Sequence, residues 1–291
     1  MILVIVGPTC VGKTKLSIEL SKKYNGEVIN ADSTQVYKNL DIATAKVTTT
    51  EMEGIKHHLL DIKNIDEDYT VFDFQRDCRH CIEDIISRGK TPILVGGTGL
   101  YIKAALYDYK FEKDVTKHDY SNYTNQELYN RLISIDPNTL IHINNRKRIE
   151  RYLSYYDSTG NLLNKEKTDK LLYDSIFIGL TTDRNILYER INKRVDVMIN
   201  NGLLAEAKRI FDSKVRSKSI MTPIGYKELF PYFEGSKDLD YCIDLIKKNS
   251  RHYAKRQYTW FNNQMNINWF NVDFKNFDNT VNEVCNFINV K

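Results

Sequence analysis

Long apolar segments are missing from this sequence. The first seven residues, MILVIVG, are apolar, but they fall far short of the roughly 20 residues that a membrane-spanning helix needs. They also lack the basic start of a signal peptide. We therefore expect a cytoplasmic protein with no membrane partner.

Cysteine is scarce as well. The five cysteines form an odd, scattered set that does not read as a disulfide framework: Cys10, Cys78, Cys81, Cys242 and Cys285. The CRHC segment at 78–81 is a lone CxxC, and a zinc site would need a second pair at suitable spacing. The adjacent His57 and His58 likewise lack acidic or thiol partners at ligand spacing. We expect structural thiols and no zinc site.

A strong excess of one charge is also missing. The chain carries 42 basic and 38 acidic residues, a net charge of +4, so it is not a polycation as a whole. The basic residues are nevertheless clustered. Residues 245–272 contain no Asp or Glu, while five Lys and Arg fall between Lys247 and Arg256, and RKRIER at 146–151 is a second cluster. Clusters of this kind favour an anionic partner at defined places.

Buried strands and helices alternate along both ends of the chain. Apolar runs at 1–7, 27–33 and 91–101 predict parallel strands, with helices at 13–24 and 71–89 between them. A further strand is expected at 174–180, and a long helical stretch at 184–211, broken near Gly202. This order predicts an α/β fold, a doubly wound parallel sheet of the P-loop NTPase kind with helices on both faces.

The middle of the chain has a different character. Residues 109–171 are polar and rich in Tyr and Asn, and they contain two helical segments without a buried strand. We therefore expect residues 1–108 and 172–291 to form a P-loop α/β core with C-terminal helices, and residues 109–171 to form a helical insertion domain.

The segment GPTCVGKT at 7–14 fits G-x-x-x-x-G-K-[ST] and lies between a predicted strand and a predicted helix. Glycines let backbone N–H groups turn toward phosphate oxygens, and the helix N-terminus adds partial positive charge. Lys13 adds a point charge, and the Thr14 hydroxyl is the expected Mg²⁺ ligand. The predicted phosphate or diphosphate site consists of Gly7, Pro8, Thr9, Cys10, Val11, Gly12, Lys13 and Thr14.

A carboxylate follows the second predicted strand, in VINADSTQVY at 28–37. Asp32 should therefore emerge at the carboxyl edge of the sheet, where ligands of such folds bind. It could hold Mg²⁺ or act as a general base. Because DSTQ is also a helix-capping pattern, the residues alone leave catalysis and capping equally open.

Several blocks together carry a family resemblance. GPTCVGKT, NADSTQVYKNLDIATAK (30–46), HHLLDI (57–62), YTVFDF (69–74), GKTPILVGGTGLYIKA (89–104), RVDVMINNGL (194–203), IGYKEL (224–229) and YAKRQYTWF (253–261) span nearly the whole chain. In this order they resemble the tRNA dimethylallyltransferase family, which transfers an isoprenyl group to an adenosine of tRNA. The absence of a C-terminal Cys/His cluster favours the bacterial type.

The resemblance implies a reaction. A dimethylallyl group would pass from dimethylallyl diphosphate to the exocyclic amine (N6) of the adenosine 3′-adjacent to the anticodon, and diphosphate would be released. Asp32 matches the family's general base. Thr14, near Mg²⁺, and Arg194, as a direct clamp, match the residues that assist the diphosphate. We expect a monomer.

The resemblance also implies contacts with the tRNA anticodon stem-loop. They fall on Asp32, Ser33, Thr34 and Gln35, on the insertion segment Lys147, Arg148, Ile149, Glu150 and Arg151, and on Lys255, Arg256 and Gln257 within the block that runs to Asn262. Basic residues interleaved with aromatic ones suit phosphate contact and base stacking. Trp260 is expected mainly to pack in the core.

Three positions depart from the family pattern. Ala43 and Val47 stand where glycine and proline are common, so we expect the loop after Asp32 to differ in detail. Asn262 replaces a frequent arginine, which removes one phosphate contact.

Other functions remain open from the sequence. A P-loop small-molecule kinase would use Asp32 to orient a hydroxyl toward a nucleotide γ-phosphate, but it has no need of the basic C-terminal block. A prenyltransferase acting on free adenine nucleotide has no need of RKRIER. A non-enzymatic RNA-binding protein has no need of the intact Lys13, Thr14 and Asp32.

Overall fold

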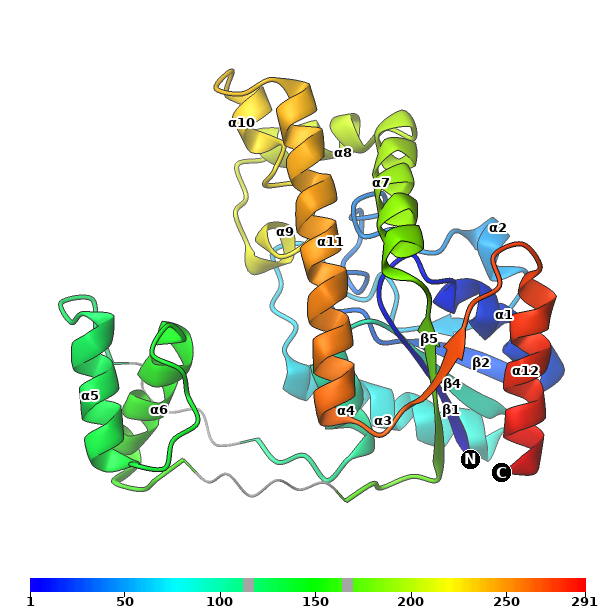
Figure 1. The fold of residues 1–291 in the computed structure, drawn as a ribbon, viewed down its shortest axis with the longest axis horizontal. Coiled ribbons are helices and arrows are strands. Elements are labelled where there is room, and N and C mark those ends of the chain that lie inside the picture. The colour runs from blue at the N-terminus through cyan, green and yellow to red at the C-terminus, as the bar shows by residue number, and fades with distance from the viewer. Residues whose placement is uncertain (112–117, 164–169) are drawn as a thin grey trace. The chain divides into compact units, whose positions relative to one another are not determined.

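A parallel sheet forms the centre of the larger part of the chain (Figure 1). The computed structural model describes residues 1–111, 118–163 and 170–291. Within them, six strands lie in the order β3-β2-β4-β1-β5-β6, and all neighbours pair in parallel. The strands are β1 (Ile2–Val6), β2 (Gly26–Asn30), β3 (His57–His58), β4 (Thr91–Val95), β5 (Ser175–Thr181) and β6 (Asn268–Asn271).

Both faces of the sheet are buried, as its continuous apolar strands predict. In β1, Leu3 and Ile5 enter one hydrophobic core, and Ile2, Val4 and Val6 enter the other. This alternation follows from the two-residue period of a strand. The central strand therefore anchors two cores at once.

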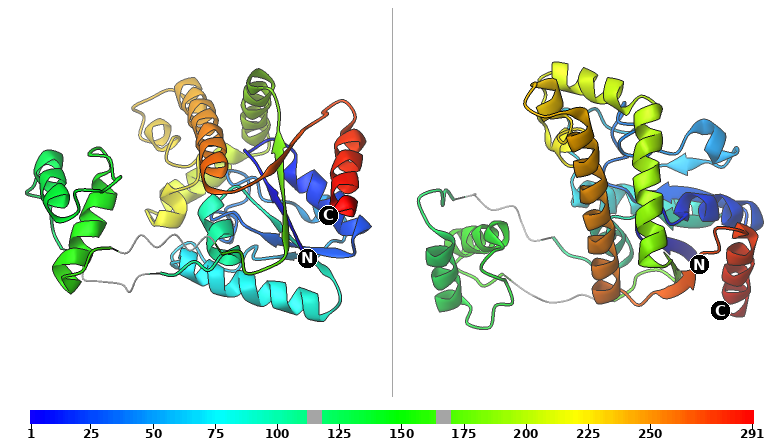
Figure 2. Two further views of the ribbon diagram at one scale, coloured as in Figure 1. Left: turned by 60° about the horizontal axis from the view of Figure 1, so that its bottom comes forward. Right: turned by 45° about the horizontal axis from the view of Figure 1, so that its top comes forward.

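Helices cover the two faces (Figure 2). The core that contains Leu3 is closed by α1 (Lys13–Lys23) and α12 (Phe277–Val290), which contact each other. The core that contains Val4 is closed by α3 (Val71–Ser87) and α4 (Gly99–Leu106). The expected α/β fold with helices on both faces is confirmed.

The short helix α2 (Thr49–Met52) lies in the connection between β2 and β3. The other helices of this unit are α7 (Arg184–Asn200), α8 (Leu203–Asp212), α9 (Lys218–Met221), α10 (Phe230–Phe233) and the long α11 (Leu239–Gln264). α11 packs against α4 at one end and against α7 over part of its length (Figure 1). The expected break in the 184–211 stretch is present at Gly202, whose φ of 100° places it in the left-handed region.

The chain divides into two compact units, residues 1–109 with 170–291, and residues 110–169. The second unit contains α5 (Asn125–Ile135) and α6 (Arg146–Thr159). A capping box formed by Thr124 and Glu127 begins α5. The helices pack through Leu128, Leu132, Ile149 and Tyr152.

The two ends of the core chain that flank the second unit are hydrogen-bonded to each other. The Asp108 N–H donates to the Lys170 carbonyl at 2.9 Å, and the Leu172 N–H donates to the Leu106 carbonyl at 2.8 Å. An antiparallel bridge joins Tyr107 to Leu171. The chain therefore leaves the larger unit and re-enters it at one place.

No helix in the described ranges is long and apolar enough to cross a membrane.

Candidate active site

The phosphate loop spans from the end of β1 to the first turn of α1. Gly7 and Gly12 have φ values of 139° and 99°, a backbone conformation that residues with a side chain rarely adopt. A Cβ on Gly7 would lie 2.6 Å from the Leu180 carbonyl oxygen, and one on Gly12 would lie 2.9 Å from the Phe277 ring. Both glycines are therefore required for the backbone conformation and for the close packing of β5 and α12.

Lys13 lies beneath this loop. Its ammonium donates hydrogen bonds to the Gly7 carbonyl at 3.0 Å and to the Pro8 carbonyl at 2.7 Å. Burial lowers the pKa of Lys13 to about 8, although the nearby Asp32 carboxylate opposes this fall. The loop therefore holds a cation whose charge is sensitive to pH near neutrality.

Asp32 lies just past β2, at the carboxyl edge of the sheet. Its Oδ1 accepts hydrogen bonds from the Thr34 N–H at 2.9 Å and the Thr34 hydroxyl at 2.6 Å. No helix begins at Asp32, because residues 31–40 form bends and turns, so the helix-capping interpretation is wrong. Instead the side chain closes a local turn. Its Oδ2 accepts no hydrogen bond from the residues that the structure describes.

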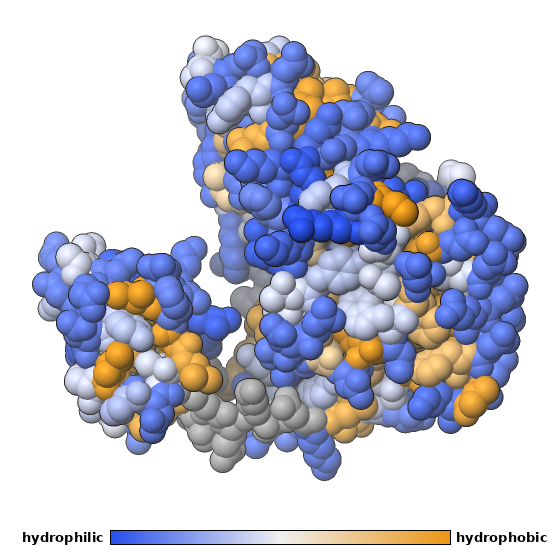
Figure 3. Space-filling view, in the orientation of Figure 1, coloured by the Kyte–Doolittle hydropathy of each residue, from blue (hydrophilic) through white to orange (hydrophobic). Residues whose placement is uncertain are grey.

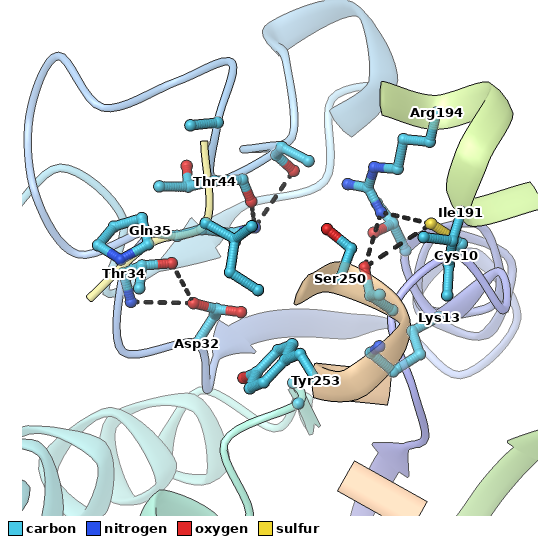
Figure 4. A pocket seen from close by; sticks show the side chains of 18 of the residues that line it. Cys10, Lys13, Asp32, Thr34, Gln35, Thr44, Ile191, Arg194, Ser250 and Tyr253 are labelled. Carbon is cyan, nitrogen blue, oxygen red and sulfur yellow. Dashed lines mark hydrogen bonds between the residues drawn. The ribbon is translucent and has the colours of Figure 1, made fainter. Parts of the chain in front are cut away.

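A pocket of about 960 Å³ brings the phosphate loop and Asp32 together (Figure 4). Lys13 and Thr14 line it from the start of α1, Asp32 from the end of β2 and Arg194 from α7. All of these elements belong to the larger unit. All three sequence-predicted catalytic residues, Thr14, Asp32 and Arg194, therefore line one cavity.

Arg194 approaches the phosphate loop from α7. Its guanidinium donates to the Thr9 hydroxyl at 3.1 Å and contacts the Cys10 sulfur at 3.5 Å. One turn earlier, Arg190 donates to the Cys10 carbonyl at 3.0 Å and lies over the Phe274 ring. Arg190 was not predicted from the sequence as a site residue. Its i−4 relationship to Arg194 on a helix is the signal that could have identified it.

The GGTG segment after β4 packs closely against its neighbours. A Cβ on Gly96 would lie 2.2 Å from the Ala31 carbonyl oxygen, and one on Gly99 would lie 2.0 Å from the Trp260 ring. The Thr98 hydroxyl accepts a hydrogen bond from the Ser33 N–H at 3.1 Å. These contacts fix the strand end that carries Asp32. Trp260 packs against the core, as expected.

Residues of the predicted tRNA-contact block lie on different sides of α11. Lys255 and Arg256 are exposed, and Arg256 lines the pocket. Gln257 is only 5% exposed; its amide oxygen accepts from the Thr9 N–H at 2.9 Å and its amide nitrogen donates to the Gly97 carbonyl at 3.1 Å. Gln257 therefore ties α11 to the phosphate loop. Figure 3 shows mainly hydrophilic side chains where α7 and α11 face the viewer.

Tyr253 also lines the pocket, one turn before Gln257. Burial raises the pKa of its hydroxyl, and the Asp32 carboxylate adds to that rise. Its aromatic ring offers the pocket an apolar face beside the carboxylate. Tyr253 is the first residue of the YAKRQYTWF segment, but its place in the pocket was not predicted from the sequence.

The basic segment of the insertion lies on α6. Lys147, Arg148 and Arg151 are exposed and form no ion pair with any described residue. Ile149 is fully buried in the core of this unit, and Glu150 pairs with Arg146. The segment therefore offers three cations to solvent, while its other two members stabilise the helix pair.

The described residues contain no group of three His, Cys, Asp or Glu side chains that could hold a metal ion. His57 lines the pocket, and its Nδ1 is 2.9 Å from the Ile55 carbonyl oxygen, so Nδ1 carries the proton. Its buried Nε2 has no partner in the parts of the chain that are described. Burial lowers the pKa of His57.

Comparison with known proteins gives consistent matches. Residues 35–264 match the family model described as IPP transferase. The chain is 48% identical to the tRNA dimethylallyltransferase of Anoxybacillus flavithermus, over all of this chain and 96% of that protein. It is also 48% identical to the enzyme of the same name from Geobacillus kaustophilus, over 98% of this chain and 95% of that one.

Solved structures match over nearly the whole chain as well. A tRNA isopentenylpyrophosphate transferase from Staphylococcus epidermidis is 43% identical, with a TM-score of 0.76, and the match covers 99% of this chain and 98% of that one. A eukaryotic dimethylallyltransferase acting on tRNA is 32% identical, with a TM-score of 0.83, over 98% of this chain and 77% of that one.

Proposed function

Because the chain belongs to the IPP transferase family of tRNA-modifying enzymes, we propose that its pocket carries out that family's reaction. A dimethylallyl group passes from dimethylallyl diphosphate to N6 of the adenosine that is 3′-adjacent to the anticodon in tRNA, and diphosphate leaves. The observation that carries this proposal is the shared pocket of Lys13, Asp32 and Arg194. Two cations, which suit a leaving diphosphate, and a carboxylate, which suits an incoming nucleophile, line this pocket and support the proposal.

The phosphate loop and Arg194 bind the diphosphate. As the bond between C1 of the dimethylallyl group and the diphosphate oxygen breaks, its electron pair remains on that oxygen. Cations and backbone N–H groups aimed at this charge stabilise the transition state. Lys13 and Arg194 supply the cations, and the Thr9 hydroxyl, 3.1 Å from Arg194, helps to hold that guanidinium.

Asp32 is the general base. The adenosine amine forms a new N–C1 bond and must lose one proton, which Asp32 accepts. Oδ1 is held by Thr34, so the side chain is oriented and Oδ2 remains as the acceptor. A positioned base contributes typically about 10²–10⁴ in rate.

Thr14 is the proposed ligand of Mg²⁺. The residues that the structure describes form no cluster of His, Cys, Asp or Glu side chains for a metal ion, and a single hydroxyl suits an ion that keeps several waters and binds substrate phosphates. When bound, Mg²⁺ would neutralise charge on the diphosphate.

The tRNA anticodon stem-loop is the proposed partner. Asp32, Ser33, Thr34 and Gln35 meet the adenosine, and an unpaired loop base enters a pocket at less cost than a base in a duplex. Lys147, Arg148 and Arg151 of α6, together with Lys255 and Arg256 of α11, suit phosphate contacts. We propose that the enzyme acts as a monomer in the cytoplasm.

Label transfer tests the proposal. The protein is incubated with unmodified tRNA, Mg²⁺ and radiolabelled dimethylallyl diphosphate, without ATP, and label in precipitated RNA is counted. We expect label in RNA with the wild type and almost none with Asp32→Ala. A separate reaction supplies ATP in place of dimethylallyl diphosphate. No label with any tRNA in the first reaction, together with phosphate released from ATP in the second, would refute the proposal in favour of a kinase.

A further inference from the structure

Glu206 is a buried carboxylate on α8 whose partners lie on the loop that follows Asp32. It accepts hydrogen bonds from three consecutive backbone N–H groups, those of Asp41 at 3.0 Å, Ile42 at 3.0 and 3.1 Å and Ala43 at 3.1 Å. The Tyr226 hydroxyl adds a fourth at 2.8 Å. Glu206 has no ion pair with any residue in the described ranges.

The other side of the same loop holds Gln35. The loop is closed by hydrogen bonds from the Ala45 N–H to the Ile42 carbonyl at 3.0 Å and from the Lys46 N–H to the Asp41 carbonyl at 2.9 Å. The Gln35 amide nitrogen donates to the carbonyls of Thr44 at 3.0 Å and Ala45 at 3.2 Å (Figure 4).

These two contacts fix the orientation of the Gln35 amide. Carbonyl oxygens only accept hydrogen bonds, so the NH₂ group of Gln35 must face them and the amide oxygen must turn away. Gln35 lines the pocket, only three residues after Asp32. Its free amide oxygen is the group that remains to meet a base.

We propose that Glu206 is a positioning residue. It holds the loop that orients the Gln35 amide oxygen toward the nucleoside, and it thereby raises the affinity of the site for RNA. The inference rests on the proposed function, since Gln35 is there assigned to the base. Hydrogen bonds from N–H groups to a carboxylate are among the strong ones. Through these hydrogen bonds, Glu206 of α8 holds the loop whose carbonyl groups orient the Gln35 amide.

The IGYKEL segment supports this arrangement. Gly225 has a φ of 129°, and a Cβ there would lie 3.1 Å from the Ala43 Cβ. Tyr226 is fully buried, so its hydroxyl has little freedom to leave Glu206. Ala43 itself has no positive φ, so its methyl group fits this loop without backbone strain. The IGYKEL segment and α8 therefore both pack against the loop at residues 41–46.

A double-mutant cycle tests the inference. Glu206→Gln, Gln35→Ala and the double variant are compared by the Kd for an unmodified anticodon stem-loop RNA, measured by fluorescence anisotropy. Glu206→Gln turns an amide NH₂ toward backbone N–H groups, so we expect RNA binding to weaken about tenfold. In the Gln35→Ala background the same change should weaken it less than about twofold. Equal effects in both backgrounds would overturn the inference.

Two further variants separate positioning from stability. Tyr226→Phe removes one donor at nearly constant volume and should give a smaller loss of RNA affinity, again abolished by Gln35→Ala; it serves if Glu206→Gln does not fold. Val284→Ala opens a cavity in the core between the sheet and α12. It should lower stability but leave RNA affinity unchanged; an equal loss of affinity would show that the effect is only structural.

Amide hydrogen exchange measures the protection of the loop in the absence of RNA. The amides of Asp41, Ile42 and Ala43 should exchange faster in Glu206→Gln than in the wild type, and at the wild-type rate in Gln35→Ala. Unchanged exchange in Glu206→Gln would contradict the inference. If the wild type binds the RNA but transfers no label to tRNA, the proposed function fails, while the cycle and the exchange still test the role of Glu206.

Discussion

The amide oxygen of Gln257 accepts a hydrogen bond from the Thr9 backbone N–H at 2.9 Å, across 248 positions of sequence. The same amide donates to the Gly97 carbonyl. One buried side chain of α11 therefore joins the phosphate loop to the loop after β4.

Gln257→Ala should consequently weaken diphosphate binding more than RNA binding. It leaves the buried Gly97 carbonyl unpaired, at a cost of about 1–3 kcal/mol, and removes the partner of the partly buried Thr9 N–H, which frees the loop. Isothermal titration with diphosphate, with Lys255→Ala as a control on the exposed side of the same helix, measures the difference. A selective loss of RNA affinity in Gln257→Ala would instead support a direct tRNA contact.

Asp32→Ala should retain diphosphate and tRNA binding but lower turnover by about 10²–10⁴, because it removes only the proton acceptor. Arg194→Ala should show the opposite balance, with weaker diphosphate binding. Single-turnover rates and separate binding constants distinguish the two. Equal losses of binding and turnover in Asp32→Ala would point to a role in folding.

Diphosphate affinity should fall as the pH rises through about 8. The pKa of Lys13 is lowered to about 8, so its ammonium is charged below that pH and loses its charge above it. With a pKa at the ordinary 10.5, the loss would begin only near pH 10. Titrations from pH 7 to 9.5 should show a decline approaching tenfold per unit above pH 8.

Lys13→Met corrects for the ionisation of the ligand. In this variant the affinity should be low, and its remaining pH dependence should be that of diphosphate alone. A wild-type profile parallel to that of Lys13→Met would contradict the prediction.

Glu27 should make stability sensitive to acid. The bidentate Arg88 guanidinium, at 2.6 and 2.7 Å, holds the pKa of this buried carboxyl well below its usual range, with help from Lys90 and His58. A lowered carboxyl pKa contributes stability that is present above the unfolded value of about 4.5 and is lost as the pH falls below it.

Urea unfolding at pH 7 and pH 4 measures this effect. Glu27→Gln should reduce the difference in unfolding free energy between the two pH values, and Arg88→Ala should destabilise the protein at pH 7, because the buried Glu27 carboxylate then loses its bidentate partner. Glu53→Gln, which removes the exposed pair with Lys22, is the control and should change stability by less than about 1 kcal/mol. Equal effects of Glu27→Gln and Glu53→Gln would argue against the prediction.

The central strands could be predicted from sequence because their apolar residues are continuous. The edge strands could not. β6 reads NWFN, with exposed asparagines at both ends, and β3 is only two residues long. Edge strands pair on one side only, so little apolar sequence is required of them.

The candidate site was predicted where one local motif carries the chemistry, as at Lys13, Thr14 and Asp32. The prediction of the site was incomplete where the role of a residue depends on partners that are distant in the sequence. A run such as Lys255, Arg256 and Gln257 turns about 100° per residue on a helix, so neighbours face different environments. In the sequence Glu206 looks like one more polar residue of an amphipathic helix, because three of its four partners are backbone N–H groups more than 160 positions away.

The backbone hydrogen bond between Asp108 and Lys170 holds together the two points where the chain leaves and re-enters the larger unit. Residues 110–169 could therefore be deleted without separating these points. A short turn could join these two positions without stretching the chain, and the entropy of closing a loop rises only slowly with its length. Residues 110–169 could therefore change in length while the two ends of the larger unit stay joined by the same hydrogen bonds.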